Sequence, residues 1–283
     1  MIVINTGLKS HNKQKDGTMY MYKKLLGITG VVLLSTSMNL NAAEDVTAAV
    51  AESGKKTQAQ AGVSAKELMV NSYKYLGSLK HYSFKATIVN EDEYADHMML
   101  YLSHNYEVAV QRPDKLRMNV KGDVDNRNTV MNNGKVSIID MESNKYAVLA
   151  VEADIDDALD TLVEDYNLPI PLTQLLYSDA AEDIEEDMGE GYFFGIVQVD
   201  DKPCYYIGFP GKEWDIQLWI EKGERPLIRR AGFVDKMTKG QPRSMIKVAW
   251  NIDKITDQSV FEFSTPKGAT KVEIPKVEKK DKK

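Results

Sequence analysis

Residues 106–120 read YEVAVQRPDKLRMNV, and this stretch decides the fold. An apolar side chain stands at every second position on both sides of Arg112-Pro113-Asp114. The apolar set is Tyr106, Val108 and Val110 before the interruption, and Leu116, Met118 and Val120 after it. Because side chains alternate between the two faces of a strand, this spacing predicts two antiparallel strands that share one apolar face.

Arg112 occupies the next position on that apolar face, directly before Pro113. A residue before proline is held extended, so its side chain is expected to leave the sheet on the apolar side. An unpaired buried guanidinium costs several kcal/mol, which places Arg112 at the mouth of a cavity, where it could meet a carboxylate, phosphate or ester. The alternative is that Arg112 pairs with a nearby Asp or Glu, or extends to water.

Alternating runs of this kind recur along the chain and predict about ten or eleven strands, with Asn133-Gly134 as a tight hairpin turn. Helices are predicted from the capping box at Ser64 through about Leu79, from the N-cap Asp154 to about Tyr166, and briefly over residues 172–177. The expected fold class is α+β and mainly β: one large antiparallel sheet, curled by its twist into an incomplete β-barrel and lidded by a few helices.

Several strands carry a uniformly apolar face that these few helices have to cover. Two or three short helices cannot easily fill the concave side of such a sheet, so an apolar cavity is expected. The alternative is that side chains fill the interior. The residues expected to line the cavity are Tyr106, Val108, Val110, Arg112, Leu116, Met118, Val120, Leu159, Leu162, Tyr166, Ile216, Leu218, Ile246, Val248 and Trp250.

The N-terminal region reads as an export signal. Lys23 and Lys24 precede an apolar run over residues 25–34, and cleavage is expected near Ala42 and Ala43, which predicts a periplasmic protein. The expected organisation is a signal peptide with an upstream extension over 1–43, a flexible lead-in over 44–63, a single domain over 64–275 and a disordered lysine-rich tail over 276–283.

Charge and motif content exclude several classes of function. The formal net charge is −6, and it becomes more negative once the lysine-rich signal is removed, so nucleic acid is not an expected partner. The acidic run over 179–187 lacks the ligand spacing of a calcium loop and is expected to be a solvated face. There is no HExxH, G-x-S-x-G or phosphate-loop pattern, so no catalytic residue, metal or cofactor is expected, and the protein is not predicted to be an enzyme.

The only cysteine in the chain is Cys204, so an intramolecular disulfide is excluded. It lies among strand-forming residues and is expected to be a buried, inert thiol rather than a nucleophile.

Three stretches, in this order, resemble the lipoprotein-carrier (LolA/LolB-like) superfamily, in its branch of predicted periplasmic proteins of unknown function. They are QRPDKLRMNV at 111–120, TVMNNGKVSIIDMESNKYAVL at 129–149 and FEFSTPKGATKVEI at 261–274. The resemblance implies an incomplete barrel whose cavity takes acyl chains, and a role for Arg112 in opening and closing the lid. Segment 154–190 is acidic and departs from the carriers, so the resemblance implies the fold more than the cargo.

The expected function is that of a soluble periplasmic carrier or sensor, which shields the acyl chain of a lipid or lipoprotein in its half-barrel. The alternative is a periplasmic interaction or structural protein whose cavity is filled. Expected partners are the acyl chains and, transiently, a membrane protein, and the chain itself is expected to be monomeric.

Overall fold

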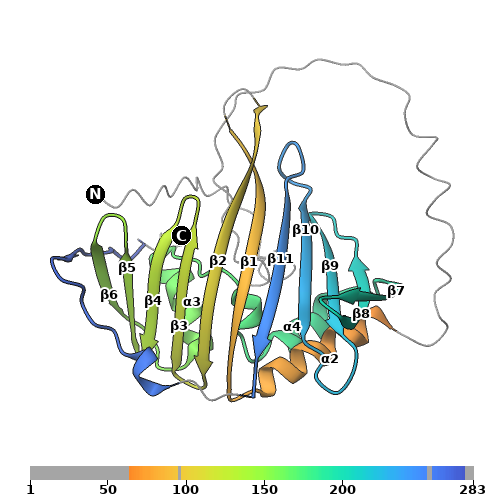
Figure 1. Cartoon of the computed structure of the whole chain (residues 1–283), viewed down its shortest axis with the longest axis horizontal. Helices are drawn as coiled ribbons and strands as arrows, with labels where there is room; N and C mark the ends of the chain where they lie inside the picture. Colours follow the sequence, from red (N-terminus) through yellow and green to blue (C-terminus); the bar gives the residue numbers. More distant parts are fainter. Residues whose placement is uncertain (1–63, 95–96, 254–256, 278–283) are drawn as a thin grey trace, which may run out of the picture.

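The computed structural model describes residues 64–94, 97–253 and 257–277, and one sheet runs through all three ranges (Figure 1). The strands are β1 (His81–Glu93), β2 (Met99–Gln111), β3 (Lys115–Gly122), β4 (Asn126–Asn132), β5 (Lys135–Asp140), β6 (Lys145–Ala150), β7 (Tyr192–Val199), β8 (Lys202–Phe209), β9 (Trp214–Glu221), β10 (Ile228–Asp235), β11 (Arg243–Asn251) and β12 (Thr270–Lys271). The helices are α2 (Ala65–Ser78), α3 (Ile155–Tyr166), the 3₁₀ turn η2 (Thr173–Leu175), α4 (Ala180–Asp187) and the 3₁₀ turn η3 (Gln258–Phe261). The predicted signal peptide and lead-in lie outside the described residues.

The sheet has twelve strands in the order β12-β6-β5-β4-β3-β2-β1-β11-β10-β9-β8-β7. Its two end strands, β12 and β7, do not pair with each other, so the sheet is open, as predicted. All neighbouring strands are antiparallel except β12, which pairs parallel with β6. This parallel strand could not be predicted from the sequence, because its two residues are too few to show an alternating pattern.

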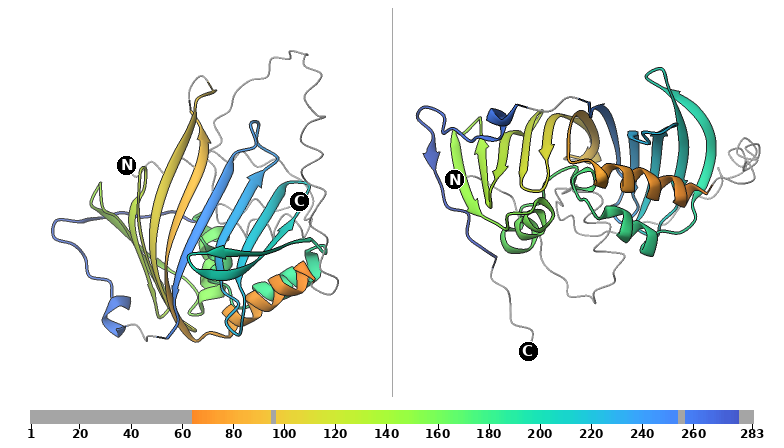
Figure 2. Two further views of the ribbon diagram at one scale, coloured as in Figure 1. Left: turned by 45° about the vertical axis from the view of Figure 1, so that its right-hand side comes forward. Right: turned by 90° about the horizontal axis from the view of Figure 1, so that it is seen from below.

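The register of the central strands confirms the face predicted from residues 106–120. Tyr106 pairs with Val120, Val108 with Met118, and Val110 with Leu116, so all six side chains lie on one face of the sheet. Figure 2 shows α2, α3 and α4 on one side of the curved sheet, and their inward side chains join this face in one hydrophobic core.

The predicted helix starts are confirmed. The Ser64 hydroxyl accepts a hydrogen bond from the Glu67 backbone N–H, and the Asp154 carboxylate accepts one from the Asp156 N–H. Helical spacing in the sequence predicts apolar stripes of Leu68, Tyr75, Leu76 and Leu79 in α2 and of Ile155, Leu159, Leu162, Val163 and Tyr166 in α3, and these were partly wrong. Met69 and Tyr73 lie on the inner face of α2, whereas Leu68 and Tyr75 are only partly buried. In α3, Ala158 is buried and Val163 is exposed.

The last part of the described chain wraps around the β6 edge of the sheet. It begins at η3 on the face away from the helices, where Phe261 is fully buried and the Arg117 guanidinium donates to the Val260 carbonyl oxygen at 2.9 Å. We call residues 270–277 the strap. The strap continues through β12 to α3, where the Lys276 ammonium and the Val277 N–H both donate to Asp165. The sequence predicts a disordered tail from Lys276 onward, but in the structure Lys276 forms an ion pair with Asp165 at 2.8 Å.

Candidate functional site

The candidate site lies between the sheet and the segment that links β6 to α4. We call residues 155–178, which comprise α3, the following loop and η2, the lid. The lid begins where the Ile155 N–H donates to the Pro113 carbonyl oxygen at 2.8 Å, beside the turn that joins β2 to β3. Leu159, Leu162, Ile170, Leu172 and Leu176 of the lid are buried in the same hydrophobic core as the sheet residues.

The predicted lining residues are all brought together on the inner face of this core. Tyr166 of the lid and Trp250 of β11 are partly buried, and the indole N–H of Trp250 donates to the Ile228 carbonyl oxygen at 2.7 Å. The remaining apolar members are buried: Tyr106, Val108, Val110, Leu116, Met118, Val120, Leu159, Leu162, Ile216, Leu218, Ile246 and Val248. They share one hydrophobic core, as the predicted face requires, but of the residues predicted to line a cavity only Tyr106, Met118 and Val120 line the one described next.

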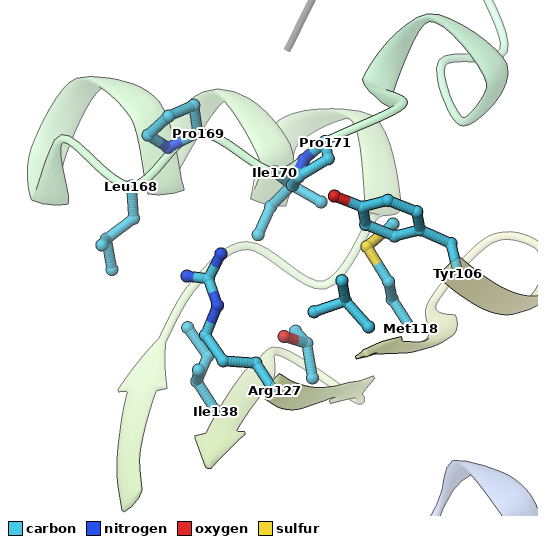
Figure 3. A pocket seen from close by; sticks show the side chains of 10 residues that line it. Tyr106, Met118, Arg127, Ile138, Leu168, Pro169, Ile170 and Pro171 are labelled. Carbon is cyan, nitrogen blue, oxygen red and sulfur yellow. The ribbon is translucent and has the colours of Figure 1, made fainter. Parts of the chain in front are cut away.

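A small cavity lies under the loop of the lid, and Figure 3 shows the side chains around it. Tyr106, Met118 and Val120 lie on its sheet side. The other lining residues, which the sequence analysis missed, are Arg127, Thr129, Ile138, Leu168, Pro169, Ile170 and Pro171. The alternation of Arg127, Thr129 and Met131 in the sequence of β4 could have shown that Arg127 and Thr129 lie on the face toward the cavity. The cavity volume is about 20 Å³, enough for about one water molecule, so the lid fills most of the space beneath it.

Arg112 is held by the lid and does not lie at an open mouth. Its Nη2 donates to the Leu176 carbonyl oxygen at 2.6 Å and to the Tyr82 hydroxyl at 3.4 Å, and its Nη1 lies 3.4 Å from Oδ1 of Asp156. Only 13% of the Arg112 side chain is exposed. The expectation of an open position is therefore corrected, and the alternative of pairing with a nearby carboxylate is confirmed. The correction arises because sequence periodicity gives the face of a residue but not what covers it.

The partners of Arg112 are themselves fixed by the lid. Asp156 accepts hydrogen bonds from both the backbone N–H and the hydroxyl of Ser178, and the Tyr82 hydroxyl donates to the Leu175 carbonyl oxygen at 2.7 Å. Burial raises the pKa of Tyr82 well above its usual value, and the neighbouring Arg112 opposes this only in part. We call Arg112, Tyr82, Asp156 and the Leu175–Leu176 carbonyls the latch, since they join the sheet to both ends of the lid.

The latch and the neighbouring η2 leave two buried polar atoms unsatisfied. These are the Arg112 Nε–H and the Gln174 Oε1, two of the buried polar atoms that have no hydrogen-bond partner in the described residues. Gln174 belongs to η2 of the lid. An unpaired buried polar group costs about 1–3 kcal/mol, so the closed lid is held with a polar deficit at this end.

Within the described ranges, no group of three or more His, Cys, Asp or Glu residues is placed to hold a metal ion. No helix in those ranges has the length and hydropathy to cross a bilayer. Cys204 is buried, as predicted, on the opposite face of the sheet from the lid, next to Val199 and Trp219.

Comparisons with solved structures find matches of low sequence identity. An uncharacterized conserved protein from Thermus thermophilus is 15% identical, with a TM-score of 0.41 over 74% of this chain and 98% of that one. The lipoprotein LppX from Mycobacterium tuberculosis is 11% identical, with a TM-score of 0.36 over 68% and 96% of the two chains. A LolA superfamily protein from Nitrosomonas europaea is 9% identical, with a TM-score of 0.30 over 71% and 98%.

No curated protein matches the sequence. The profile of one family, described as predicted periplasmic proteins, matches residues 65–275, which include the sheet, the lid and most of the strap. This agrees with the periplasmic location and with the branch expected from the sequence. The chain therefore belongs to the DUF2092 family of predicted periplasmic proteins.

Proposed function

We propose that this protein is a periplasmic carrier or sensor that binds an apolar chain, such as the acyl chain of a lipid or lipoprotein, between the sheet and the lid. The observation that carries the proposal is that the lid makes apolar contacts with the sheet along its length and polar contacts at its two ends. The layer facing the sheet is apolar, whereas the ends of the lid are joined to the sheet by the polar latch.

The physical argument concerns what the lid covers. If the lid moved away, the inner face of β2 and β3 would become a continuous apolar surface bearing Tyr106, Val108, Met118 and Val120. An acyl chain could replace the lid side chains on this surface, gaining roughly 25 cal/mol for each Å² of apolar area removed from water. The cavity is small, so in this proposal the structure described is the closed form and binding has to displace the lid.

Arg112 provides the polar end of the proposed site. Its guanidinium donates to the carbonyl oxygen of Leu176, and the ester or carboxylate oxygen of a lipid is an acceptor of the same kind. A ligand head that takes this hydrogen bond would release η2 from the sheet. In this proposal, opening of the lid and recognition of the ligand use the same donor.

The filled interior also favours the second function considered from the sequence, an interaction or structural protein without a ligand. The small cavity volume, about 20 Å³, is the observation that supports this second function. The two functions differ in whether the lid ever leaves the sheet.

The test is native mass spectrometry, with solvent extraction, of the protein purified from a periplasm. A carrier is expected to yield co-purified lipid, and Arg112→Leu is expected to lower the amount of lipid retained at least severalfold. A matched control is Arg225→Leu, which removes an exposed arginine paired with Asp253 and should leave the lipid load unchanged. Protein that folds normally but carries no lipid, also after incubation with phospholipid vesicles, would reject the carrier and support the second function.

A further inference from the structure

The two edges of the sheet differ in whether another segment of the chain covers them. At one end, the strap covers β6: Thr270 pairs with Lys145, and the Val272 N–H donates to the Tyr146 carbonyl oxygen at 2.8 Å. At the other end, among the residues that the structure describes, no strand lies beyond β7 (Figure 1). The outward backbone groups of β7 are therefore available to a further strand.

The exposed edge of β7 lacks most of the features that normally prevent pairing. Edge strands are usually protected by charged residues, by proline, by a covering element or by a bulge. The sequence of β7, YFFGIVQV, contains no charged residue and no proline. Its one protective feature is a register shift between Phe193 and Gly195, and the pairing with β8 is regular from Gly195 to Val199. A regular, uncharged edge remains over those residues.

Exposed apolar side chains lie on both faces of this edge strand. Tyr192 and Phe194, on the outer face, are 61% and 39% exposed, and Ile196, on the inner face, is 45% exposed. Phe194 is supported from behind by Tyr206 at 4.8 Å between ring centroids, and Tyr206 stacks on Trp219 at 4.5 Å. This row of packed rings is already ordered, so a partner strand that covers Phe194 would pay little conformational entropy.

The residues at both ends of β7 are acidic, and this decides which strand can bind. Asp187 and Glu190 precede the strand, and Asp200 and Asp201 follow it. Asp200 forms an ion pair with Lys247 at 2.8 Å, whereas Glu190 and Asp201 have no ion-pair partner in the described part of the chain. A strand added in either direction has its two ends beside these carboxylates.

The acidic ends argue against a second copy of this chain as the partner. Antiparallel pairing of two β7 strands would bring Glu190 of one copy toward Asp200 and Asp201 of the other. Parallel pairing would align each carboxylate with its own counterpart. Both arrangements place like charges opposite each other, which is unfavourable. The complementary strand is apolar in its middle and carries Lys or Arg at both ends.

We propose that the outer edge of β7 binds an extended segment of another protein, apolar along its middle and basic at both ends, by adding it to the sheet as a further strand. The backbone of Gly195–Val199 supplies the hydrogen bonds. Ile196 contacts apolar side chains of the added strand on the inner face of the sheet and Phe194 on the outer face, because the register shift puts the two on opposite faces. The flanking carboxylates attract the basic ends. This site lies at the opposite end of the sheet from the strap and does not depend on the proposed lipid site.

The experiment uses the mature full chain and a fluorescent peptide of sequence KKVTVTVKK. Binding is followed by anisotropy, and amide hydrogen exchange locates the bound peptide. The peptide is expected to bind with a dissociation constant below about 100 µM and to protect the outward amides of β7. Ile196→Lys, which adds a charge to the edge at an exposed position, should raise the dissociation constant at least tenfold.

Matched controls separate strand addition from unspecific adhesion. Met245→Lys adds the same charge at a similarly exposed position on β11, away from the edge, and should change the dissociation constant less than about twofold. The peptide EEVTVTVEE should bind at least tenfold more weakly, because its ends repel the carboxylates. Equal binding of KKVPVPVKK, which cannot pair as a strand, would overturn the proposal. So would outward β7 amides that are already protected without peptide, or no binding at 1 mM.

Discussion

Nη2 of Arg112 lies 2.6 Å from the carbonyl oxygen of Leu176, and this hydrogen bond joins the end of β2 to the lid. The arginine that the sequence assigned to a ligand head thus meets a backbone carbonyl of the protein itself. In the proposed function, an oxygen of a ligand head competes with the Leu176 carbonyl oxygen for the Nη2 donor of Arg112, so binding of the head at this donor requires the lid to release it.

Replacing Arg112 by leucine is expected to destabilise the closed protein. The change removes the hydrogen bond to Leu176 and the partner of Asp156, while the side chain is largely buried. Losing a mostly buried, charge-assisted contact costs about 2–3 kcal/mol, partly offset because Asp156 keeps its bonds to Ser178. Urea unfolding measures the loss. The matched variant Arg225→Leu, at an exposed ion pair, should show no change in midpoint, and equal midpoints for both variants would contradict the latch.

Removing the ring of Phe261 is expected to release the C-terminal segment from the outer face of the sheet. Phe261 is fully buried in η3, and its carbonyl oxygen accepts from the Asn132 side chain at 3.2 Å. Phe261→Ala should lower the free energy of unfolding by about 3–4 kcal/mol. Phe263→Ala, at a partly buried ring 5.7 Å from Tyr146, should cost clearly less, and a similar loss from the two changes would show that η3 is not an anchor.

The sequence predicted the sheet well because its information is local. Alternation fixed the inner face of β2 and β3, Asn133 and Gly134 both have positive φ as the hairpin requires, and Asp154 caps α3. The packing of the lid against the sheet could not be predicted from the sequence. Leu168, Ile170 and Leu172 are buried against strands that lie far away in the sequence, and no periodic signal marks such contacts.

The contacts of Arg112 likewise could not be predicted from local sequence patterns. Its face followed from the register with Val110, but its partners, Asp156 and Leu176, lie in the separate segment 155–178, and no spacing in the sequence relates them to Arg112. A carboxylate on an otherwise exposed helix turn cannot be paired with a distant arginine from spacing alone. The size of the cavity is equally a property of side-chain packing, which composition does not determine.

The thiol of Cys204 is expected to be unreactive in the folded protein. It is fully buried beside Trp219, and burial, with a smaller effect of Glu221, raises the pKa of the thiol. Because the thiolate is the reactive form, a disulfide reagent at pH 8 should label native protein far more slowly than protein in urea. The rate of absorbance change with the reagent measures this, and labelling of native protein at the urea rate would contradict the burial.

Stability is expected to fall in alkaline solution because of three buried tyrosines. Burial raises the pKa of Tyr73, Tyr82 and Tyr106 above the ordinary value. The folded protein therefore holds protons that the unfolded chain releases above pH about 10, so the stabilisation is complete below that pH and is lost as pH rises through the folded pKa values. Each tyrosine contributes a slope of about 1.4 kcal/mol per pH unit. Tyr82→Phe should reduce the slope above pH 10, measured by urea unfolding, and an unchanged slope would contradict this account.

Shortening the chain tests whether the strap holds the lid closed. The strap reaches α3 through two contacts with Asp165, the Lys276 ion pair at 2.8 Å and the Val277 N–H donating to the backbone carbonyl at 2.6 Å, and Ile274 packs against the core. A chain ending at Lys271 keeps β12 but loses all three. We expect faster amide exchange in α3, because local opening becomes easier, and unchanged exchange in α2, which packs against α4 and not the strap. A chain ending at Val277 keeps the three contacts and is the control. Equal exchange in α3 for both truncated chains would mean that the latch at Arg112 holds the lid without the strap.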